Sequence, residues 1–137
     1  MSEANKNVVR EIEAAWDSNQ LDKLDALLAP DFVQHSAFPG APATLDGAKQ
    51  AHQASIQTFP DRKTSIEEIV AEGDTVVVRV RMTGTNEGGL PAFNIPANGN
   101  KVDTQWVSIY RLRDGKVVEH RGIMDLMGLT QQLTATR

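Results

Sequence analysis

The sequence predicts an α+β fold in which helices cover one face of a mostly antiparallel sheet. Before residue 60, apolar residues recur at helical spacing in three segments. From residue 64 to residue 125, runs of alternating apolar and polar residues predict strands. Asp114-Gly115 separates two of these runs, which is a strong signal for a β-hairpin. Helices followed by a series of strands are typical of the α+β class.

The three predicted helices cover approximately residues 3–19, 20–28 and 48–59. The apolar stripe of the first consists of Val8, Val9, Ile12, Ala15 and Trp16. Pro30 ends the second helix and Pro60-Asp61 the third, because proline cannot continue a helix. The third helix offers Ala51, Ala54, Ile56 and Phe59 for burial, which leaves His52 exposed. Trp16 is expected in the core, with lining of a ligand cavity as the alternative.

The predicted strands cover residues 31–35, 64–71, 75–83, 101–112 and 117–125. Two stretches rich in glycine and proline, residues 36–47 and 84–100, predict irregular segments. Residues 128–133 predict a short terminal helix. No repeat or linker interrupts the chain, so a single domain covering residues 1–137 is expected.

Composition excludes several classes of protein. The 137 residues include no cysteine, which excludes disulfides and thiolate chemistry and is compatible with the cytoplasm. The formal net charge of −4 predicts no binding to nucleic acid. No apolar run approaches the roughly 20 residues needed to span a membrane, and no signal peptide is visible. A soluble cytoplasmic protein is therefore expected.

Short motifs occur in a fixed order along nearly the whole chain. They are Asp31–His35, Phe59-Pro60-Asp61, Gly73-Asp74, Gly84–Gly88, Pro96–Gly99, Arg111, Gly115–Glu119, Asp125, Gly128-Leu129 and Gln132-Leu133. With these motifs the sequence resembles the SnoaL-like polyketide (ester) cyclase family of the nuclear transport factor 2-like superfamily. The resemblance implies a cone-shaped barrel, with the three helices packed on a strongly curved sheet around an apolar interior. It also implies a cofactor-free enzyme that acts on a hydrophobic carbonyl or ester compound.

Asp125 is the first candidate for catalysis. It precedes Leu126, Met127 and Leu129, and a carboxyl group at the edge of apolar surface has a raised pKa that suits proton transfer. The resemblance gives the aspartate at this position the role of general acid and base in an intramolecular aldol closure. The alternative is a helix-capping aspartate, because a short helical pattern follows.

The neighbour of Asp125 in the cavity depends on the geometry of its strand. Strict alternation places Arg121 beside Asp125 and His120 on the other face. His120 reaches the cavity only if the strand contains a bulge, which Gly122 makes possible. Arg121 stands where the family usually has tryptophan. His120 is the second catalytic candidate, and Arg121 is a candidate for substrate binding.

Three further polar residues are candidates for substrate binding. His35 matches a family histidine that faces the cavity, with a structural histidine at a strand end as the alternative. Asn86 stands at the position of a family histidine, where an amide can bind a ligand but transfers no proton. Gln105 shares a strand face with Val107 and Ile109 and is expected to point into the cavity. Trp106 and Tyr110, on the opposite face, are expected in core or subunit packing.

Other sites are not predicted. The three histidines, at positions 35, 52 and 120, lack metal-ligand spacing, so neither a metal nor a cofactor is expected. There is no nucleophile elbow, Walker loop or dinucleotide fingerprint.

Alternative functions stay open. One is a different enzyme of the same fold. An epoxide hydrolase would use the set of Asp103, Arg121 and Asp125, and a ketosteroid isomerase would use Tyr110, which is expected on the wrong face. The other is a non-catalytic module for ligand binding or dimerisation. A homodimer or higher homo-oligomer is expected, since exposed sheet faces in this fold usually pair.

Overall fold

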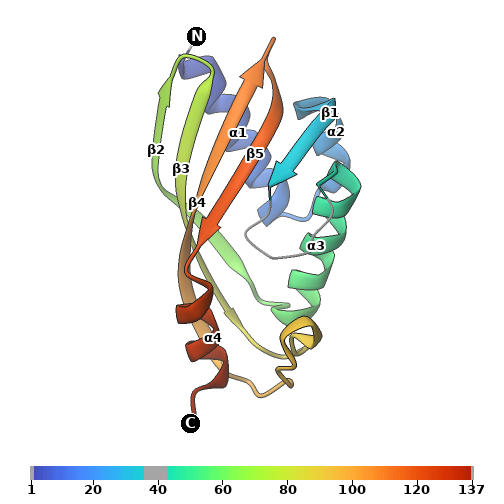
Figure 1. Ribbon diagram of the computed structural model, residues 1–137, viewed down its shortest axis with the longest axis vertical. Helices are drawn as coiled ribbons and strands as arrows, with labels where there is room; N and C mark the ends of the chain where they lie inside the picture. Colours follow the sequence, from blue (N-terminus) through green and yellow to red (C-terminus); the bar gives the residue numbers. More distant parts are fainter. Residues whose placement is uncertain (1, 36–42, 137) are drawn as a thin grey trace.

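Five strands form a single sheet in the order β1-β5-β4-β3-β2, and helices lie against it (Figure 1). The computed structural model describes residues 2–35 and 43–136. Its elements are α1 (Ser2–Asp17), η1 (Leu21–Lys23), α2 (Leu24–Leu27), β1 (Leu28–His35), α3 (Leu45–Thr58), β2 (Lys63–Glu72), β3 (Thr75–Thr85), η2 (Pro91–Phe93), β4 (Lys101–Arg113), β5 (Lys116–Met124) and α4 (Leu126–Thr134). The predicted α+β class is confirmed.

The sheet is mostly antiparallel. Strands β2 to β5 pair with antiparallel neighbours, and only β1 runs parallel to its partner, β5. The predicted hairpin turn joins β4 to β5, and both of its residues have positive φ, 54° at Asp114 and 78° at Gly115. Two successive residues of positive φ match the twist of paired strands, which is why Asp-Gly is favoured there.

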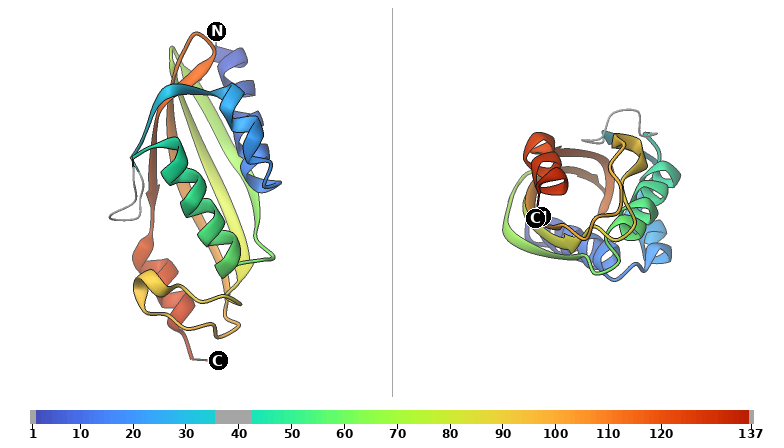
Figure 2. Two further views of the ribbon diagram at one scale, coloured as in Figure 1. Left: turned by 90° about the vertical axis from the view of Figure 1, so that its right-hand side faces the viewer. Right: turned by 90° about the horizontal axis from the view of Figure 1, so that it is seen from below.

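The sheet is strongly curved, and the helices close its open side. Seen from one end, strands and helices together form a ring (Figure 2). Helix α1 packs against β2 and β3, and α3 lies beside β1. The predicted cone of helices on a curved sheet is thus present. None of the helices in the described ranges combines the length and apolar character that crossing a bilayer requires.

The apolar core has two parts. The larger part joins α1, α2 and the inner face of the sheet, with Val9, Ile12, Leu24, Val76, Val78, Val80 and Val117 almost fully buried. The smaller part lies toward α4 and contains Phe59, Met82, Ile95, Val102, Leu129 and Leu133. The predicted alternation of β3 is confirmed, since Val76, Val78, Val80 and Met82 all face inward. Burial of these side chains is the main force that holds the sheet against the helices.

Strand β1 and helix α3 each begin three residues earlier than predicted. Strand β1 begins at Leu28, within the predicted second helix, because Leu28 and Ala29 are buried in extended conformation. Helix α3 begins at Leu45, where the Thr44 hydroxyl caps it by accepting a hydrogen bond from the Gly47 N–H. Of the predicted irregular segment 36–47, residues 36–42 lie outside the described residues.

The buried face of α3 also differs from the prediction. Ala51 and Ala54 are exposed, whereas His52, predicted to be exposed, is only 8% exposed. The helix turns the stripe of Ala48, His52, Ser55 and Phe59 inward. These residues follow the i, i+4, i+7, i+11 spacing of one helix face. The sequence prediction selected an adjacent stripe because it counted apolar residues alone.

Candidate active site

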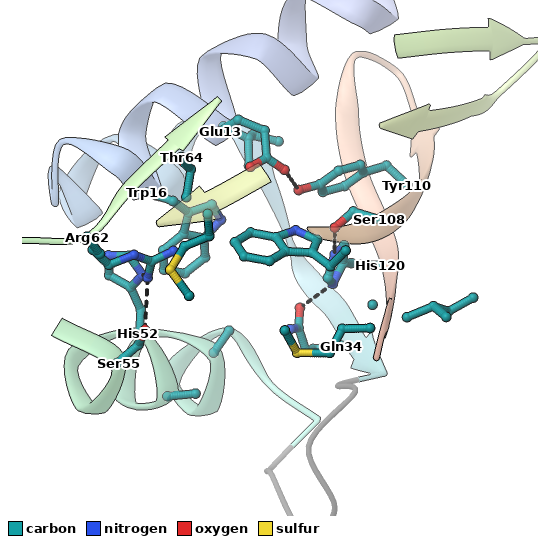
Figure 3. A pocket seen from close by; sticks show the side chains of 18 of the residues that line it. Glu13, Trp16, Gln34, His52, Ser55, Arg62, Thr64, Ser108, Tyr110 and His120 are labelled. Carbon is teal, nitrogen blue, oxygen red and sulfur yellow. Dashed lines mark hydrogen bonds between the residues drawn. The ribbon is translucent and has the colours of Figure 1, made fainter. Parts of the chain in front are cut away.

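A cavity of about 220 Å³ lies between α1, α3 and the inner face of the sheet (Figure 3). Most of its wall is apolar and includes Ile12, Trp16, Leu28, Phe32, Phe59, Met82, Trp106, Met124 and Leu129. Nine polar or charged side chains that form hydrogen bonds also line it, namely Glu13, Gln34, His52, Ser55, Arg62, Thr64, Ser108, Tyr110 and His120. An apolar hollow with a few convergent polar groups is the usual form of a small-molecule site.

His120 enters the cavity because β5 contains a bulge. Arg111 on β4 pairs with Glu119, and the next residue, Leu112, pairs with Val117, so Val118 is an extra residue. The bulge reverses the alternation of the strand, so both Val117 and His120 face inward. A bulge was the condition for His120 to reach the cavity, and it lies at Val118 rather than at Gly122.

His120 is held by hydrogen bonds at both ring nitrogens. Its Nδ1 lies 2.9 Å from Oε1 of Gln34, and its Nε2 lies 2.9 Å from Oγ of Ser108. The Gln34 oxygen only accepts, so Nδ1 carries the proton and Nε2 accepts from the Ser108 hydroxyl. Burial lowers the pKa of His120 to about 4, with a smaller contribution from His35. The imidazole is therefore neutral at physiological pH.

A buried carboxyl group lies next to this histidine network. The Tyr110 hydroxyl donates a 2.5 Å hydrogen bond to Oε1 of Glu13, and the Tyr110 ring lies 4.8 Å from the His120 ring, centre to centre. Burial raises the pKa of Glu13, while the Tyr110 hydrogen bond and the charge of Arg62 oppose that rise. Burial also raises the pKa of Tyr110, so the phenol keeps its proton. Ser108 connects Tyr110 with His120. Its hydroxyl hydrogen-bonds His120 and also lowers the pKa of Tyr110.

A second polar cluster lies on the α3 side of the cavity. Nη1 of Arg62 donates hydrogen bonds to Nδ1 of His52 and to Oγ of Ser55, both at 3.2 Å. The His52 ring packs against the Trp16 ring with 4.8 Å between their centres. Burial, with help from the Arg62 charge, lowers the pKa of His52 to about 4. The cavity therefore has two polar sides with apolar surface between them (Figure 3).

Comparison with known families decides the relationship. The model of the family described as SnoaL-like polyketide cyclase matches residues 6–133. The chain belongs to this family. No curated protein matches the chain.

Solved structures of other proteins are similar to this family member over nearly their full length. TsrD from Streptomyces laurentii is 26% identical, with a TM-score of 0.83, over 98% of this chain and 97% of that chain. IdmH from Streptomyces antibioticus, described as a candidate polyketide cyclase, is 29% identical, with a TM-score of 0.82, over 94% and 97%. A candidate SnoaL-like polyketide cyclase from Jannaschia sp. CCS1 has a TM-score of 0.88 over 100% and 96%, and its 24% identity shows the shared fold alone.

In this SnoaL-like protein, the aspartate that the resemblance makes catalytic lies outside the cavity. Asp125 is exposed and caps α4, because its Oδ1 accepts a 2.8 Å hydrogen bond from the Gly128 N–H. The expected position in a water-poor hollow is therefore wrong, and the alternative of a capping aspartate describes the structure. A Cβ at Gly128 would lie 2.3 Å from Oδ2 of Asp125, so a larger residue there would displace the capping carboxylate. The physical reason is the bulge at Val118, which turns His120 inward and leaves Arg121, Ile123 and Asp125 outward.

Arg121 and His35 lie on the outer side of the sheet. Both approach Glu119, with Nε2 of His35 at 2.8 Å and Nη2 of Arg121 at 3.7 Å from its Oε2. The expectation that His35 faces the cavity is wrong, because its neighbour Gln34 pairs with His120 and points inward instead. Arg121 is not beside Asp125 in a cavity, and its exposed guanidinium belongs to a surface ion pair.

Asn86 and Gln105 also lie away from the cavity. Asn86 is fully buried, and its side chain cross-links the irregular segment 84–100. It donates a hydrogen bond to the Pro96 carbonyl and accepts one from the Gly89 N–H. Gln105 is exposed and accepts a 2.6 Å hydrogen bond from Nη1 of Arg79, so its expected inward orientation is wrong. Asn86 holds a loop in shape, which is the commonest use of a buried amide.

Trp16 lines the cavity, as one of its two sequence interpretations allowed. Tyr110 and Trp106 line it as well, so the face assigned to packing is the cavity face. The set of Asp103, Arg121 and Asp125 does not gather there, since Asp103 forms an exposed ion pair with Arg81.

Sequence reasoning missed Glu13, Gln34, His52, Arg62 and Ser108. Glu13 carried a usable signal, because a carboxyl group three residues before Trp16 lies within the apolar stripe of α1. Arg62 carried no such signal, because a single arginine after Pro60-Asp61 is typical of an exposed position. Within the described residues, no three side chains of His, Cys, Asp or Glu converge as metal ligands would.

Proposed function

We propose that this SnoaL-like protein is a cofactor-free enzyme that removes a proton next to a carbonyl group in a hydrophobic small molecule. The class of activity rests on family membership, and the residues rest on the cavity. The observation that carries the proposal is a neutral, hydrogen-bonded His120 that lines an apolar cavity. We assign the proton acceptor to His120 instead of Asp125.

His120 is suited to both proton transfers of an aldol closure. Nε2 takes the C–H proton, and the carbonyl of the substrate becomes an enolate. The enolate carbon then attacks a second carbonyl group, and the imidazolium returns its proton to the new alkoxide, so atoms and charge balance. A base with a pKa of about 4 is weak, so hydrogen-bond donors must stabilise the enolate oxygen.

Ser108 controls the availability of the accepting nitrogen. Its hydroxyl lies within hydrogen-bond reach of Nε2 of His120 and also close to Tyr110. Rotation of this one O–H bond toward Tyr110 releases the Nε2 lone pair to a substrate. Gln34 meanwhile keeps the proton on Nδ1, as the orienting partner of a catalytic histidine does.

The test is exchange of the C1 protons of 2-tetralone in D2O, followed by proton NMR. The wild-type protein should accelerate exchange, and His120→Gln should reduce the acceleration by roughly 10²- to 10⁴-fold, the usual contribution of general acid–base catalysis. Asp125→Asn, the matched control, should stay within about threefold of wild type, since an asparagine also caps a helix.

Full exchange activity in His120→Gln would refute the assignment of His120. Loss of activity in Asp125→Asn, with an unchanged circular dichroism spectrum, would return the catalytic role to Asp125. Either result is informative, because the two side chains lie on opposite faces of the sheet.

A ligand-binding module without catalysis is the second candidate, and the outward position of Asp125 is the observation that favours it. Binding of 2-tetralone without faster proton exchange would establish this function. An epoxide hydrolase is less well supported, because its three candidate residues do not meet in the cavity.

We also propose that the outer face of the sheet forms a homodimer. Val70 and Ile123 on this face are 54% and 58% exposed, and Val77, Val107 and Ile109 lie between them. An apolar strip across a sheet surface is typical of a subunit contact. Sedimentation velocity should give a dimer for wild type and a monomer for Ile123→Glu, and a wild-type monomer at 100 μM would contradict the proposal.

A further inference from the structure

Two hydrogen-bond donors in the cavity have no partner among the described residues. They are Nε of Arg62 and Nε2 of His52, and both atoms are buried. The His52 residue is only 8% exposed, and both side chains line the cavity beside Trp16 (Figure 3). Buried polar groups in native proteins almost always have partners, so unpaired donors on two side chains that line a cavity point to a ligand that packs closely against those side chains.

Both unpaired atoms are donors rather than acceptors. The guanidinium of Arg62 always carries its protons, so Nδ1 of His52 must accept from Nη1 of Arg62. That fixes the proton of the neutral imidazole on Nε2. The Trp16 carbonyl is close enough to raise the pKa of His52 but forms no hydrogen bond of adequate geometry with Nε2. A ligand must therefore supply acceptor atoms.

The charge of Arg62 is also incompletely balanced. Burial lowers the pKa of Arg62, and the charges of Asp17 and Glu13 only partly oppose this. No ion pair joins Arg62 to a carboxylate within the described part of the chain. Asp17 instead accepts hydrogen bonds from the N–H and hydroxyl of Thr64, both at 2.9 Å, and Glu13 accepts from Tyr110. A buried cation without a paired anion is costly, and a bound anion would remove that cost.

We infer that Arg62 and His52 form a subsite for the carboxylate of a hydrophobic ligand. The inference rests on the proposed function and adds a substrate class to it. The substrate would be a carbonyl compound with a free carboxylate, held at the α3 side of the cavity while its reacting carbon lies near His120. A carboxylate supplies acceptor oxygens and the negative charge that the buried Arg62 guanidinium lacks, and Arg62 and His52 are neighbours joined by a hydrogen bond.

The experiment compares two probes of nearly the same size and shape, the carboxylate 2-naphthoate and the uncharged 2-naphthamide. Isothermal titration calorimetry at pH 7.5 should show that the wild-type protein binds the carboxylate at least tenfold more tightly than the amide. Arg62→Gln should abolish this preference while changing amide affinity by less than about threefold. In proton–nitrogen NMR spectra, the Nε–H signal of Arg62 should shift when naphthoate binds and stay in place when naphthamide binds.

Arg121→Gln is the matched control, because it removes an exposed arginine of equal charge outside the cavity and should keep the preference. If Arg62→Gln fails to fold, His52→Phe tests the same subsite by removing one of the two donors, and should reduce the preference at least threefold. Equal affinity for the two probes in wild type, no naphthoate binding at millimolar concentration, or a preference that survives in both variants would overturn the inference.

Failure here is separable from failure of the proposed function. The exchange substrate 2-tetralone has no carboxylate. Its exchange therefore does not depend on the subsite and tests His120 separately.

Discussion

The two faces of β5 carry different chemistry although their residues alternate along one strand. The inner face carries Val117 and His120, which are packed in the core and hydrogen-bonded in the cavity. The outer face carries Glu119, which forms ion pairs with Arg111 and Arg121 and a hydrogen bond with His35. The two arginine side chains are more than half exposed, and ion pairs with exposed partners contribute little to stability. The inner imidazole is shifted far from its usual pKa by burial.

This difference shows why the most conspicuous residue types do not mark the site. The resemblance selects Asp125 and His35, and strict alternation places Arg121 beside Asp125, but all three lie on the outer side. The inner face instead uses neutral donors and acceptors such as Ser108 and Gln34. A neutral network costs less to bury than ion pairs do, and it leaves proton positions adjustable.

The largest stability difference between the faces should come from packing. Val117→Ala should lower the free energy of unfolding by about 2 kcal/mol, because it removes two fully buried methyl groups. Ile123→Ala, on the exposed outer face, should change it by less than about 0.5 kcal/mol in the monomer. Urea denaturation of both variants measures the difference, and equal effects would mean that β5 does not present these faces as described.

Loss of the buried Glu13–Tyr110 hydrogen bond should have the next largest effect on stability. Tyr110→Phe leaves a buried carboxyl group without its donor, which costs about 1–3 kcal/mol. Because that hydrogen bond opposes the burial-driven rise in the pKa of Glu13, the pKa should rise further in the variant. Carbon NMR titration of the Glu13 carboxyl group measures this shift, and Glu13→Gln combined with Tyr110→Phe should be less destabilised than the sum of the single variants.

Acidification should weaken the inner face selectively. The pKa of His120 is about 4 in the folded protein and near 6.5 when unfolded, so the unfolded chain binds the proton more readily. Stability contributed by the neutral imidazole is therefore complete above about pH 6.5 and is lost as pH falls toward about 4. In urea melts from pH 7 to pH 4, His120→Gln should lose less stability than wild type. A residual loss should remain, because His52 titrates in the same direction. An imidazole midpoint near 6.5 for His120 in NMR titration would contradict the buried network.

The smallest effect should come from the outer aspartate. Asp125→Ala removes the cap of α4 and should cost about 1 kcal/mol, whereas Asp125→Asn should cost a few tenths. Thermal melts of the two variants give the comparison. A cost far above 2 kcal/mol for the alanine variant would indicate that Asp125 has buried partners in addition to the Gly128 N–H.

Local patterns in the sequence were sufficient for the class and order of the elements. The alternation of Val76, Val78, Val80 and Met82 fixed the inner face of β3, and Asp114-Gly115 fixed the hairpin, because both depend only on neighbouring residues. The family resemblance, carried by spaced motifs, was confirmed by the match over residues 6–133. These features do not depend on how distant segments of the chain pack together.

Only the tertiary structure decided which polar residues share the cavity. One extra residue at Val118 exchanged the two faces of β5, and the orientation of α3 in the fold places His52 beside Arg62. Glu13 and Tyr110 are 97 residues apart, and His120 and Gln34 are 86 apart, so no local spacing connects them. The physical reason is that side-chain direction in a strand reverses with every residue. A single bulge, too small to leave a periodic signal, therefore determines which groups face the cavity.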